Sequence, residues 1–437
     1  MTTKTDRTLV LEVRIAIVVQ HLHIATVNSR WRSNPEDMAR IPSRQRDQSR
    51  SRVIARQTKN IILLARCRLI NASSPLGFFF LNEVQKEYSD QMLKHERRSS
   101  IFDSRFELGK LDDFECLRRF RFLKSDVRKI VSLLKWDDDE FLNARRGYRA
   151  SGVEAFCIIS RRLSTPCIWR DMEYEFGRSA SVLCEIFYES IEQFYRQKGH
   201  LLEDFKADFI TQRAAEYATK VYESGAPLDS CIGFVDGTNI FIARPAGEMQ
   251  REAYNGHKKR HCVKFQALTL PDGLILHMYG PMEGCRHDLT MFRHSNLGGH
   301  LNEHMLISGR QFYVYADSAY QLQPYMMVGY RGNELSEQQR KFNMDMSKAR
   351  ITVEWTFKEI KKFFTHVDVP RKMSVSITPV GLWYFSCSIL LNFRTCLYGS
   401  QTSRYFHCKP PSLEEYFSLP SSSGWSSSSS STSEWDF

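Results

Sequence analysis

The chain has 437 residues, 42% of them apolar, so it is long enough to bury at least one large hydrophobic core. Eleven cysteines without a Cys-x-x-Cys pair argue against a disulfide framework and against a zinc site. The apolar runs at 9–19 and 380–393 are shorter than a bilayer span, so we expect no membrane segment.

The net charge of +11 is concentrated at the start of the chain. Residues 1–100 hold 18 Lys and Arg against 9 Asp and Glu, a bias typical of chains that meet nucleic acid or an acidic surface. We expect residues 1–110 to form a basic, poorly structured region. Its Arg- and Ser-rich stretch at 40–59 has two open readings, a solvated linker or an arm for phosphate binding or nuclear targeting.

Residues 111–225 have helical periodicity. Ser125 is placed to cap a helix. Further on, one helix is expected to end at Gly177 and the next to be capped by Ser179. This predicts an all-α, helix-turn-helix-like region, with a plain helical hairpin as the alternative.

Strand patterns begin at Cys231, and residues 226–400 predict a mixed α/β domain. We expect a strand that ends at Asp236 and continues after a Gly-Thr turn, then a hairpin at the Pro-Asp-Gly of 271–273. Later come a helix capped by Asp288, a strand that ends in Asp317 and a helix over 349–364. The Ser-rich tail at 401–437 predicts disorder.

The carboxylates at the two strand ends are expected to meet at one edge of the sheet. Glu354 lies beside the apolar stripe of its helix, where it could complete a cluster with Asp236 and Asp317. Such a cluster suits Mg²⁺ or Mn²⁺ and the displacement chemistry of phosphodiesters. Each residue also has a structural reading: Asp236 as a turn residue, Asp288 and Asp317 as helix caps or turns, and Glu354 as an ion-pair partner of Lys358.

The order of the motifs VDGTN, YNGHKKRHCVKFQALTLPDG, GPMEGCRHDLTMF, YADSAY and ARITVEWTFKEIK resembles the DDE endonuclease domain of PIF/Harbinger-type transposases. The resemblance implies an RNase H-like mixed sheet with flanking helices. It assigns Asp236, Asp317 and Glu354 as catalytic ligands of two Mg²⁺ or Mn²⁺ ions, with Asp288 as a further candidate ligand. It also implies a DNA substrate, a nuclear location with the cytoplasm as alternative, and a separate Myb-like targeting partner. A homo-oligomer is left open.

A basic run just before a strand predicts DNA contacts from Lys258, Lys259, Arg260 and His261, with a solvated loop as the alternative, and we add Arg178 to this set. The sequence departs from the family pattern at four positions, Asn239, Ala319, Trp355 and Lys358. We therefore expect a metal-dependent DNA endonuclease or transposase. The alternatives are a domesticated, non-catalytic DNA-binding scaffold derived from a transposase and, third, an RNA-binding role for the basic and helical regions.

Overall fold

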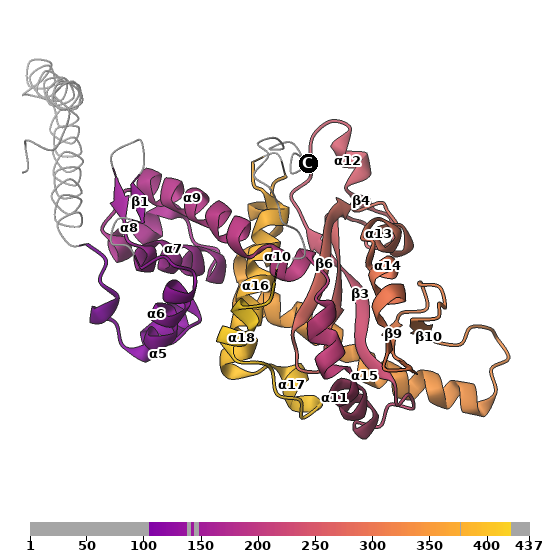
Figure 1. Ribbon diagram of the computed structural model, residues 1–437. Helices are drawn as coiled ribbons and strands as arrows, with labels where there is room; N and C mark the ends of the chain where they lie inside the picture. Colours follow the sequence, from indigo (N-terminus) through magenta and orange to yellow (C-terminus); the bar gives the residue numbers. More distant parts are fainter. Residues whose placement is uncertain (1–104, 138–140, 144–147, 376, 421–437) are drawn as a thin grey trace, which may run out of the picture. The chain divides into compact units, whose positions relative to one another are not determined.

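The computed structural model describes residues 105–137, 141–143, 148–375 and 377–420 (Figure 1). The predictions for residues 1–104, including the basic arm, lie outside the described residues, and so do those for the last 17 residues of the tail.

A group of helices precedes the central sheet. Their starts follow local capping chemistry: the side chain of Ser151 accepts a hydrogen bond from the Glu154 amide, and Gly177 ends its helix in the left-handed region at φ +61°. Ser125 does not cap a helix as predicted, because the helix begins one residue earlier, after Leu123. The elements are η1 (Leu108–Lys110), α5 (Asp113–Phe120), α6 (Lys124–Leu133), β1 (Leu142–Asn143), β2 (Arg149–Ala150), α7 (Gly152–Ser164), α8 (Trp169–Phe176), α9 (Ala180–Lys198), α10 (His200–Glu203) and α11 (Ala207–Glu223).

The central sheet is mixed, and its strands follow the order β10-β9-β3-β5-β4, with β6 also paired to β5. β3 pairs parallel with β9 and antiparallel with β5, and β5 pairs antiparallel with β6 across the predicted Pro-Asp-Gly hairpin. This arrangement confirms the predicted α/β class and is that of an RNase H-like fold. The strands are β3 (Cys231–Phe241), β4 (Tyr254–Asn255), β5 (Arg260–Thr269), β6 (Ile275–Glu283), β9 (Tyr313–Ala316) and β10 (Met326–Val328).

The turn predicted after Asp236 is wrong. β3 runs unbroken through Asp236, Gly237 and Thr238, each of which has a partner on β5. The ladder to β5 outweighs the local turn preference of an Asp-Gly pair, because both residues have a registered partner on that strand.

The elements between and after these strands complete the domain. The predicted helix at 349–364 begins much earlier, at Glu337, where Ser336 and Gln339 form a capping box. The helix α13 begins at Asp288, so the residue before it, His287, is the N-cap. The elements are α12 (Met249–Glu252), α13 (Asp288–His294), α14 (Leu297–His304), β7 (Leu306–Ile307), β8 (Arg310–Gln311), α15 (Glu337–Phe363), η2 (Thr365–Asp368), η3 (Pro370–Lys372), α16 (Val380–Tyr398), α17 (Gln401–Tyr405) and α18 (Leu413–Phe417).

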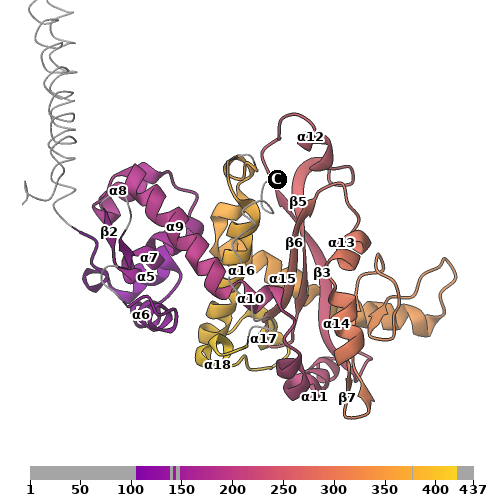
Figure 2. The same cartoon turned by 45° about the horizontal axis from the view of Figure 1, so that its top comes forward.

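Helices cover both faces of the sheet (Figure 2). On one face, the ring of Phe265 in β5 packs 4.5 Å from that of Tyr384 in α16. On the other face, Gln266 of β5 donates a hydrogen bond to Ser295, which follows α13. The helix α15 packs against β3, β5 and β9, so it crosses three strands of the sheet.

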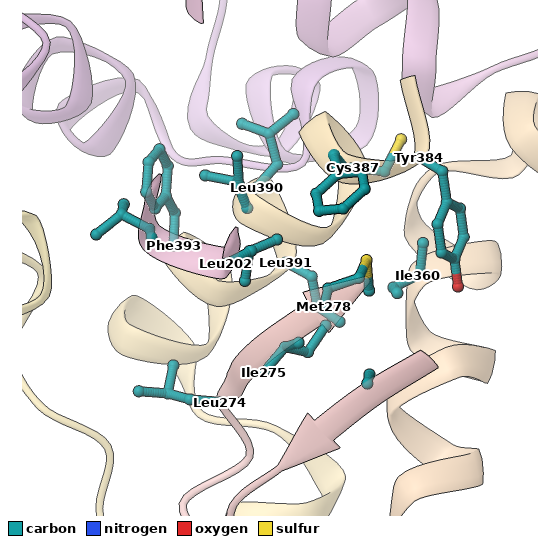
Figure 3. Packing of buried hydrophobic residues seen from close by; sticks show 14 of the residues in the cluster. Leu202, Leu274, Ile275, Met278, Ile360, Tyr384, Cys387, Leu390, Leu391 and Phe393 are labelled. Carbon is teal, nitrogen blue, oxygen red and sulfur yellow. The ribbon is translucent and has the colours of Figure 1, made fainter. Parts of the chain in front are cut away.

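The helix α16 forms the centre of the hydrophobic core (Figure 3). Its residues are apolar nearly all round, which is the pattern of a helix buried on every side. Leu390 and Leu391 pack near Ile275 and Met278 of β6. By length and composition α16 could cross a membrane, but 83% of the apolar window is buried inside the protein, as predicted for a core helix.

The prediction of a disordered tail from residue 401 is wrong for its first 20 residues. The helices α17 and α18 lie there, and Phe406 and Tyr416 are each only 2% exposed. Tyr416 accepts a hydrogen bond from Asn392 of α16 over 2.8 Å. Residues 401–420 are therefore part of the folded core.

Candidate functional site

The pairing of β3 with β9 brings Asp236 and Asp317 together. The last registered pair of these parallel strands is Val235 with Ala316, and each aspartate is the next residue along its strand. Neighbouring positions on paired parallel strands lie side by side on the same face of a sheet. Both residues therefore lie at the same edge of the sheet, Asp236 within its strand and Asp317 directly after the end of one.

Asp236 is held in a nearly buried position. Its side chain is 17% exposed, and one oxygen accepts the amide hydrogen of Gly237 at 2.8 Å. Asp317 is arranged similarly, since it accepts the Ser318 amide at 2.6 Å, while its backbone carbonyl accepts the Tyr320 amide at 3.0 Å. Both carboxylates are therefore fixed by their own backbone, as a rigid site requires.

Glu354 reaches the same place from α15. Arg350, one turn earlier on the same helix, links Glu354 to Asp236. The Nη2 atom of Arg350 lies 3.9 Å from a Glu354 oxygen. The other guanidinium nitrogen, Nη1, donates to Asp236 Oδ2 at 2.7 Å. The far side of Glu354 lies 3.7 Å from Lys358, so the ion pair expected for a helical Glu is present as well. Arg350 thus lies between two of the three predicted catalytic carboxylates.

The three carboxylates act on one another electrostatically. Burial raises the pKa of Asp236 to about 6; Arg350 and the Gly237 amide oppose this shift, and the charges of Asp317 and Glu354 add to it. Like charges within reach of a buried carboxylate favour its protonated form unless a cation neutralises them. The cluster therefore needs a positive partner, and in this structure that partner is Arg350.

The chemistry of the three groups fits a divalent cation. Carboxylate oxygens are the preferred ligands of Mg²⁺ and Mn²⁺, and here three elements direct such groups at one region. Among the described residues, however, no group of three or more His, Cys, Asp or Glu side chains is close enough to hold a metal ion. Arg350 fills the space between Asp236 and Glu354, so a cation bound by both would have to displace the guanidinium.

Asp288 lies beside this cluster and has a cationic partner of its own. Its carboxylate pairs with Lys264 of β5, whose Nζ also donates to the Arg286 carbonyl at 2.9 Å. A Cβ at Gly237 would lie 3.2 Å from the same carboxylate, so Asp288 covers the strand next to Asp236. Lys264 neutralises Asp288 in this structure, as Arg350 neutralises Asp236, and Asp288 stays a further candidate ligand.

The departures from the family pattern have simple local explanations. Asn239 accepts a weak hydrogen bond from the Cys262 thiol at 3.5 Å, within the sheet. The ring of Trp355 packs edge-on against Tyr405, 5.4 Å away, and so helps to fix α17 on α15. Ala319 has no positive φ, so a Cβ causes no backbone strain there.

The predicted basic contacts divide into two groups. Lys258, Lys259 and Arg260 are exposed on the turn between β4 and β5, with His261 partly covered beside them. We call residues 254–261 the basic hairpin. Arg178 is different: it is 6% exposed, and its Nη2 donates to Glu154 at 2.8 Å. A buried, paired arginine has no free face for phosphate, so Arg178 leaves our DNA-binding set.

The helix-turn-helix outline is present, but its second helix is a poor reader of DNA. Residues 177–179 connect α8 to α9, as predicted. The exposed positions of α9 include Glu189 and Glu192 against a single arginine, Arg196. Helices that enter a DNA groove carry cationic surfaces. The structure therefore favours the alternative reading of a plain helical hairpin.

Two residues near the site, Arg350 and Tyr320, were given no role there from the sequence. Arg350 precedes Glu354 by four residues, and this spacing alone places both on one face of a helix. Tyr320 is 1% exposed, and its hydroxyl lies within electrostatic reach of Asp236, Asp288 and Asp317. Its signal was the aromatic residue three positions after Asp317, at the end of the YADSAY motif.

Fold and site together define an RNase H-like carboxylate centre. Comparison with known families gives the same class: residues 235–392 match the family described as DDE superfamily endonuclease. The chain is also similar to Protein ALP1-like of Arabidopsis thaliana, with 27% identity over 199 residues. That alignment covers 43% of this chain, which spans about half, 47%, of the length of the relative. No solved structure gives a significant match.

Proposed function

We propose that the protein is a divalent-metal-dependent endonuclease of transposase ancestry, which cuts phosphodiester bonds in DNA. One observation carries the proposal. Asp236, Asp317 and Glu354 come from three separate elements of a DDE endonuclease domain, and the charges of Asp317 and Glu354 both act on the carboxylate of Asp236. In a protein with only a structural use for them, three carboxylates would be expected to lie apart or to pair separately.

Asp236, Asp317 and Glu354 would hold the Mg²⁺ or Mn²⁺ ions. Bound there, two such ions would supply the charge stabilisation and the activated water that in-line phosphoryl displacement needs. The protein positions the carboxylates on rigid backbone and limits water access to Asp236, whose side chain is 17% exposed. Arg350 keeps the carboxylates neutralised until a cation and a phosphate take its place.

The basic hairpin would position the DNA backbone. Lys258, Lys259 and Arg260 lie at the end of β5 that pairs with β4 and are exposed to solvent, so they can neutralise phosphates without reading sequence. Base-specific targeting then needs another reader, since α9 is acidic on its exposed side. This supports our proposal of a separate Myb-like partner. The proposed location, the nucleus, follows from the DNA substrate.

The test is nicking of supercoiled plasmid by the purified full chain in Mg²⁺ and in Mn²⁺. We expect nicking that EDTA abolishes and that falls at least about a hundredfold in Asp317→Asn, because this change removes a negative ligand and leaves the shape of the side chain. The matched control is Asp229→Asn, an exposed aspartate with 72% of its side chain accessible, which should nick like the wild type. Equal nicking by Asp317→Asn and wild type would refute the assigned site.

A second function is favoured by one observation, the ion pair of Arg350 with Asp236. It neutralises the centre without metal, as a domesticated, non-catalytic DNA-binding scaffold would require. The same experiment separates the two: absent nicking, with DNA binding equal in wild type and Asp317→Asn, favours the scaffold. Repeating the assay with Arg350→Gln shows whether the guanidinium alone blocks the metal.

A further inference from the structure

A cavity of about 380 Å³ opens next to Asp317, between the segment that follows β9 and the first turns of α15. A volume of this order is typical of small-molecule sites in proteins. We call it the tyrosine pocket. It is lined by Tyr320, Gln321, Leu322, Met327, Val328, Gly329, Tyr330, Arg331 and Phe342.

Two walls of the tyrosine pocket border the carboxylate centre. Tyr320 donates its backbone amide to the Asp317 carbonyl at 3.0 Å and its hydroxyl to Gln266 at 3.3 Å. On the other side, a Cβ at Gly329 would lie 3.2 Å from the hydroxyl of Tyr315, whose own neighbours include Asp317 and Arg350. The pocket lining therefore begins three residues after Asp317, on the segment that follows β9.

The walls are held in place without a ligand. The side-chain amide of Asn343 clamps the backbone of Tyr330 through two hydrogen bonds of 2.8 and 3.0 Å. Arg331 donates to the Tyr320 carbonyl at 2.8 Å. The rings of Tyr330 and Phe342 meet edge-on, with centroids 5.3 Å apart. A preformed site binds with less loss of conformational freedom than one that must be ordered.

The lining combines aromatic faces with a few hydrogen-bonding groups. The apolar part, from Met327, Tyr330 and Phe342, does not suit a phosphate, which would need several cationic donors. It does suit a flat heterocycle, which stacks on aromatic rings and takes hydrogen bonds at its edge from groups such as Gln321 and Arg331. At the rim, Leu322 and Tyr330 are 62% and 48% exposed, so apolar surface remains uncovered there.

Three exposed cations, against the two exposed carboxylates Glu334 and Glu337 of the same segment, favour a nucleic acid as the source of that heterocycle. Arg340 and Lys341 lie exposed on α15 directly before Phe342, and Arg331 is exposed on the wall. These cations can contact phosphates on either side of a base that enters the pocket. Bases of an intact duplex are stacked and paired, so only an unpaired or extruded base can enter.

We propose that the tyrosine pocket receives one unpaired nucleobase of the DNA strand whose backbone lies at Asp236 and Asp317. The inference rests on the proposed function for its substrate, DNA, but not on catalysis. Tyr330 and Phe342 supply the stacking contact, and the pocket fixes which phosphate reaches the carboxylates. The protein thus prefers DNA that is distorted or unpaired next to the cleavage position.

The test measures DNA binding by fluorescence anisotropy in EDTA, where no cleavage occurs. The probes are three otherwise identical duplexes: fully paired, with a single-adenine bulge, and with an abasic bulge. We expect the wild type to bind the adenine bulge at least about fivefold more tightly than the abasic bulge, the size of one stacking contact. Tyr330→Ala and Phe342→Ala should bring this ratio close to one and leave affinity for the paired duplex unchanged.

The control Tyr222→Ala removes a tyrosine that is 55% exposed on α11, a helix that contributes no residue to the pocket lining, and it should keep the ratio. Tyr330 is itself half exposed, so its replacement is not expected to unfold the protein. A wild-type ratio of one, or a preference that survives in both pocket variants, overturns the inference. Plasmid nicking stays a separate test of the proposed function in both cases. If nicking is absent but the preference for the adenine bulge is retained, only the catalytic activity is refuted.

Discussion

The guanidinium of Arg350 lies 2.7 Å from the carboxylate of Asp236, and each side chain is at least four-fifths buried. An arginine from α15 therefore provides the charge balance at a centre whose carboxylates suit divalent cations. A cation at Asp236 would compete with Arg350 for the charge of this carboxylate. We therefore expect Arg350 to influence how readily a cation binds.

We expect Arg350→Gln to lower the free energy of unfolding without metal by about 1–3 kcal/mol, since it leaves a largely buried carboxylate without its charged partner. Mn²⁺ should restore more stability to this variant than to the wild type. Thermal unfolding with and without Mn²⁺ measures both effects. Lys358→Gln is the control on the same helix: its partner ion pair is exposed, so we expect less than about 0.5 kcal/mol. Equal Mn²⁺ effects in wild type and Arg350→Gln would contradict the competition.

The basic hairpin should account for part of the salt dependence of DNA binding. Each phosphate contact that is lost reduces the slope of log K against log salt by about 0.9 for duplex DNA. Replacing Lys258, Lys259 and Arg260 together by Gln should thus reduce the slope by up to about 2.7. Anisotropy titrations at several NaCl concentrations measure it. A triple Gln variant at Lys110, Arg196 and Lys220 removes the same charge from exposed helix pairs elsewhere. If both triple variants reduce the slope equally, the reduction comes from the loss of net charge and not from contacts of the basic hairpin.

The residues that carry the chemistry of the site could be predicted from the sequence. The strands and side chains with which they pair could not. The order of strands and motifs was enough to place Asp236, Asp317 and Glu354 in one domain. The Asp-Gly of residues 236–237 carries a strong turn signal, but the ladder to β5 overrides it. The role of Arg350 depends on how α15 lies across β3, a tertiary fact that no local pattern contains.

The predicted boundaries of helices and of the folded domain were wrong where residues are buried by distant parts of the chain. Residues 337–348 are mostly polar, and only Met346 in that stretch is buried, so the sequence pattern predicted the helix only from residue 349. The capping box of Ser336 and Gln339 was the remaining sequence signal for the start of this helix. The segment after residue 400 is short and polar on average. Phe406 and Tyr416 nevertheless find partners in α16 and β3, including Phe234, 5.9 Å from Phe406.

A buried carboxylate away from the site should make stability depend on pH. Asp272 is fully buried, and burial raises its pKa from the ordinary 3.8 to about 6, although the Tyr217 hydroxyl and the Leu274 amide donate to it. A raised pKa means that the folded state holds the proton more tightly than the unfolded state. The stabilisation is therefore complete below about pH 4 and is lost as the pH rises through 6.

The difference of about two between the pKa of Asp272 in the folded and unfolded states corresponds to roughly 3 kcal/mol of unfolding free energy. We expect the stability of Asp272→Asn relative to wild type to improve by about that amount between pH 4 and pH 7, since an amide does not titrate. Urea unfolding at both pH values measures it. The control Asp229→Asn removes an exposed carboxylate and should show a constant difference. A constant difference for Asp272→Asn as well would mean that its carboxyl titrates alike in both states.

Tyr416 tests whether the segment after residue 400 is part of the folded domain. Its ring packs 6.2 Å from that of Phe393, and its hydroxyl accepts from Asn392, whose amide also bonds the backbone of Ile275 in β6. Tyr416→Phe should cost about 1 kcal/mol of unfolding free energy for the lost hydrogen bond. Tyr416→Ala should cost about 3–5 kcal/mol, because it leaves a cavity beside α16. Tyr174→Ala, at a tyrosine that is 68% exposed, serves as the control and should stay within about 0.5 kcal/mol of wild type. Were Tyr416→Ala as stable as this control in urea unfolding, the C-terminal helices would contribute nothing to the core, and the predicted boundary at residue 401 would stand.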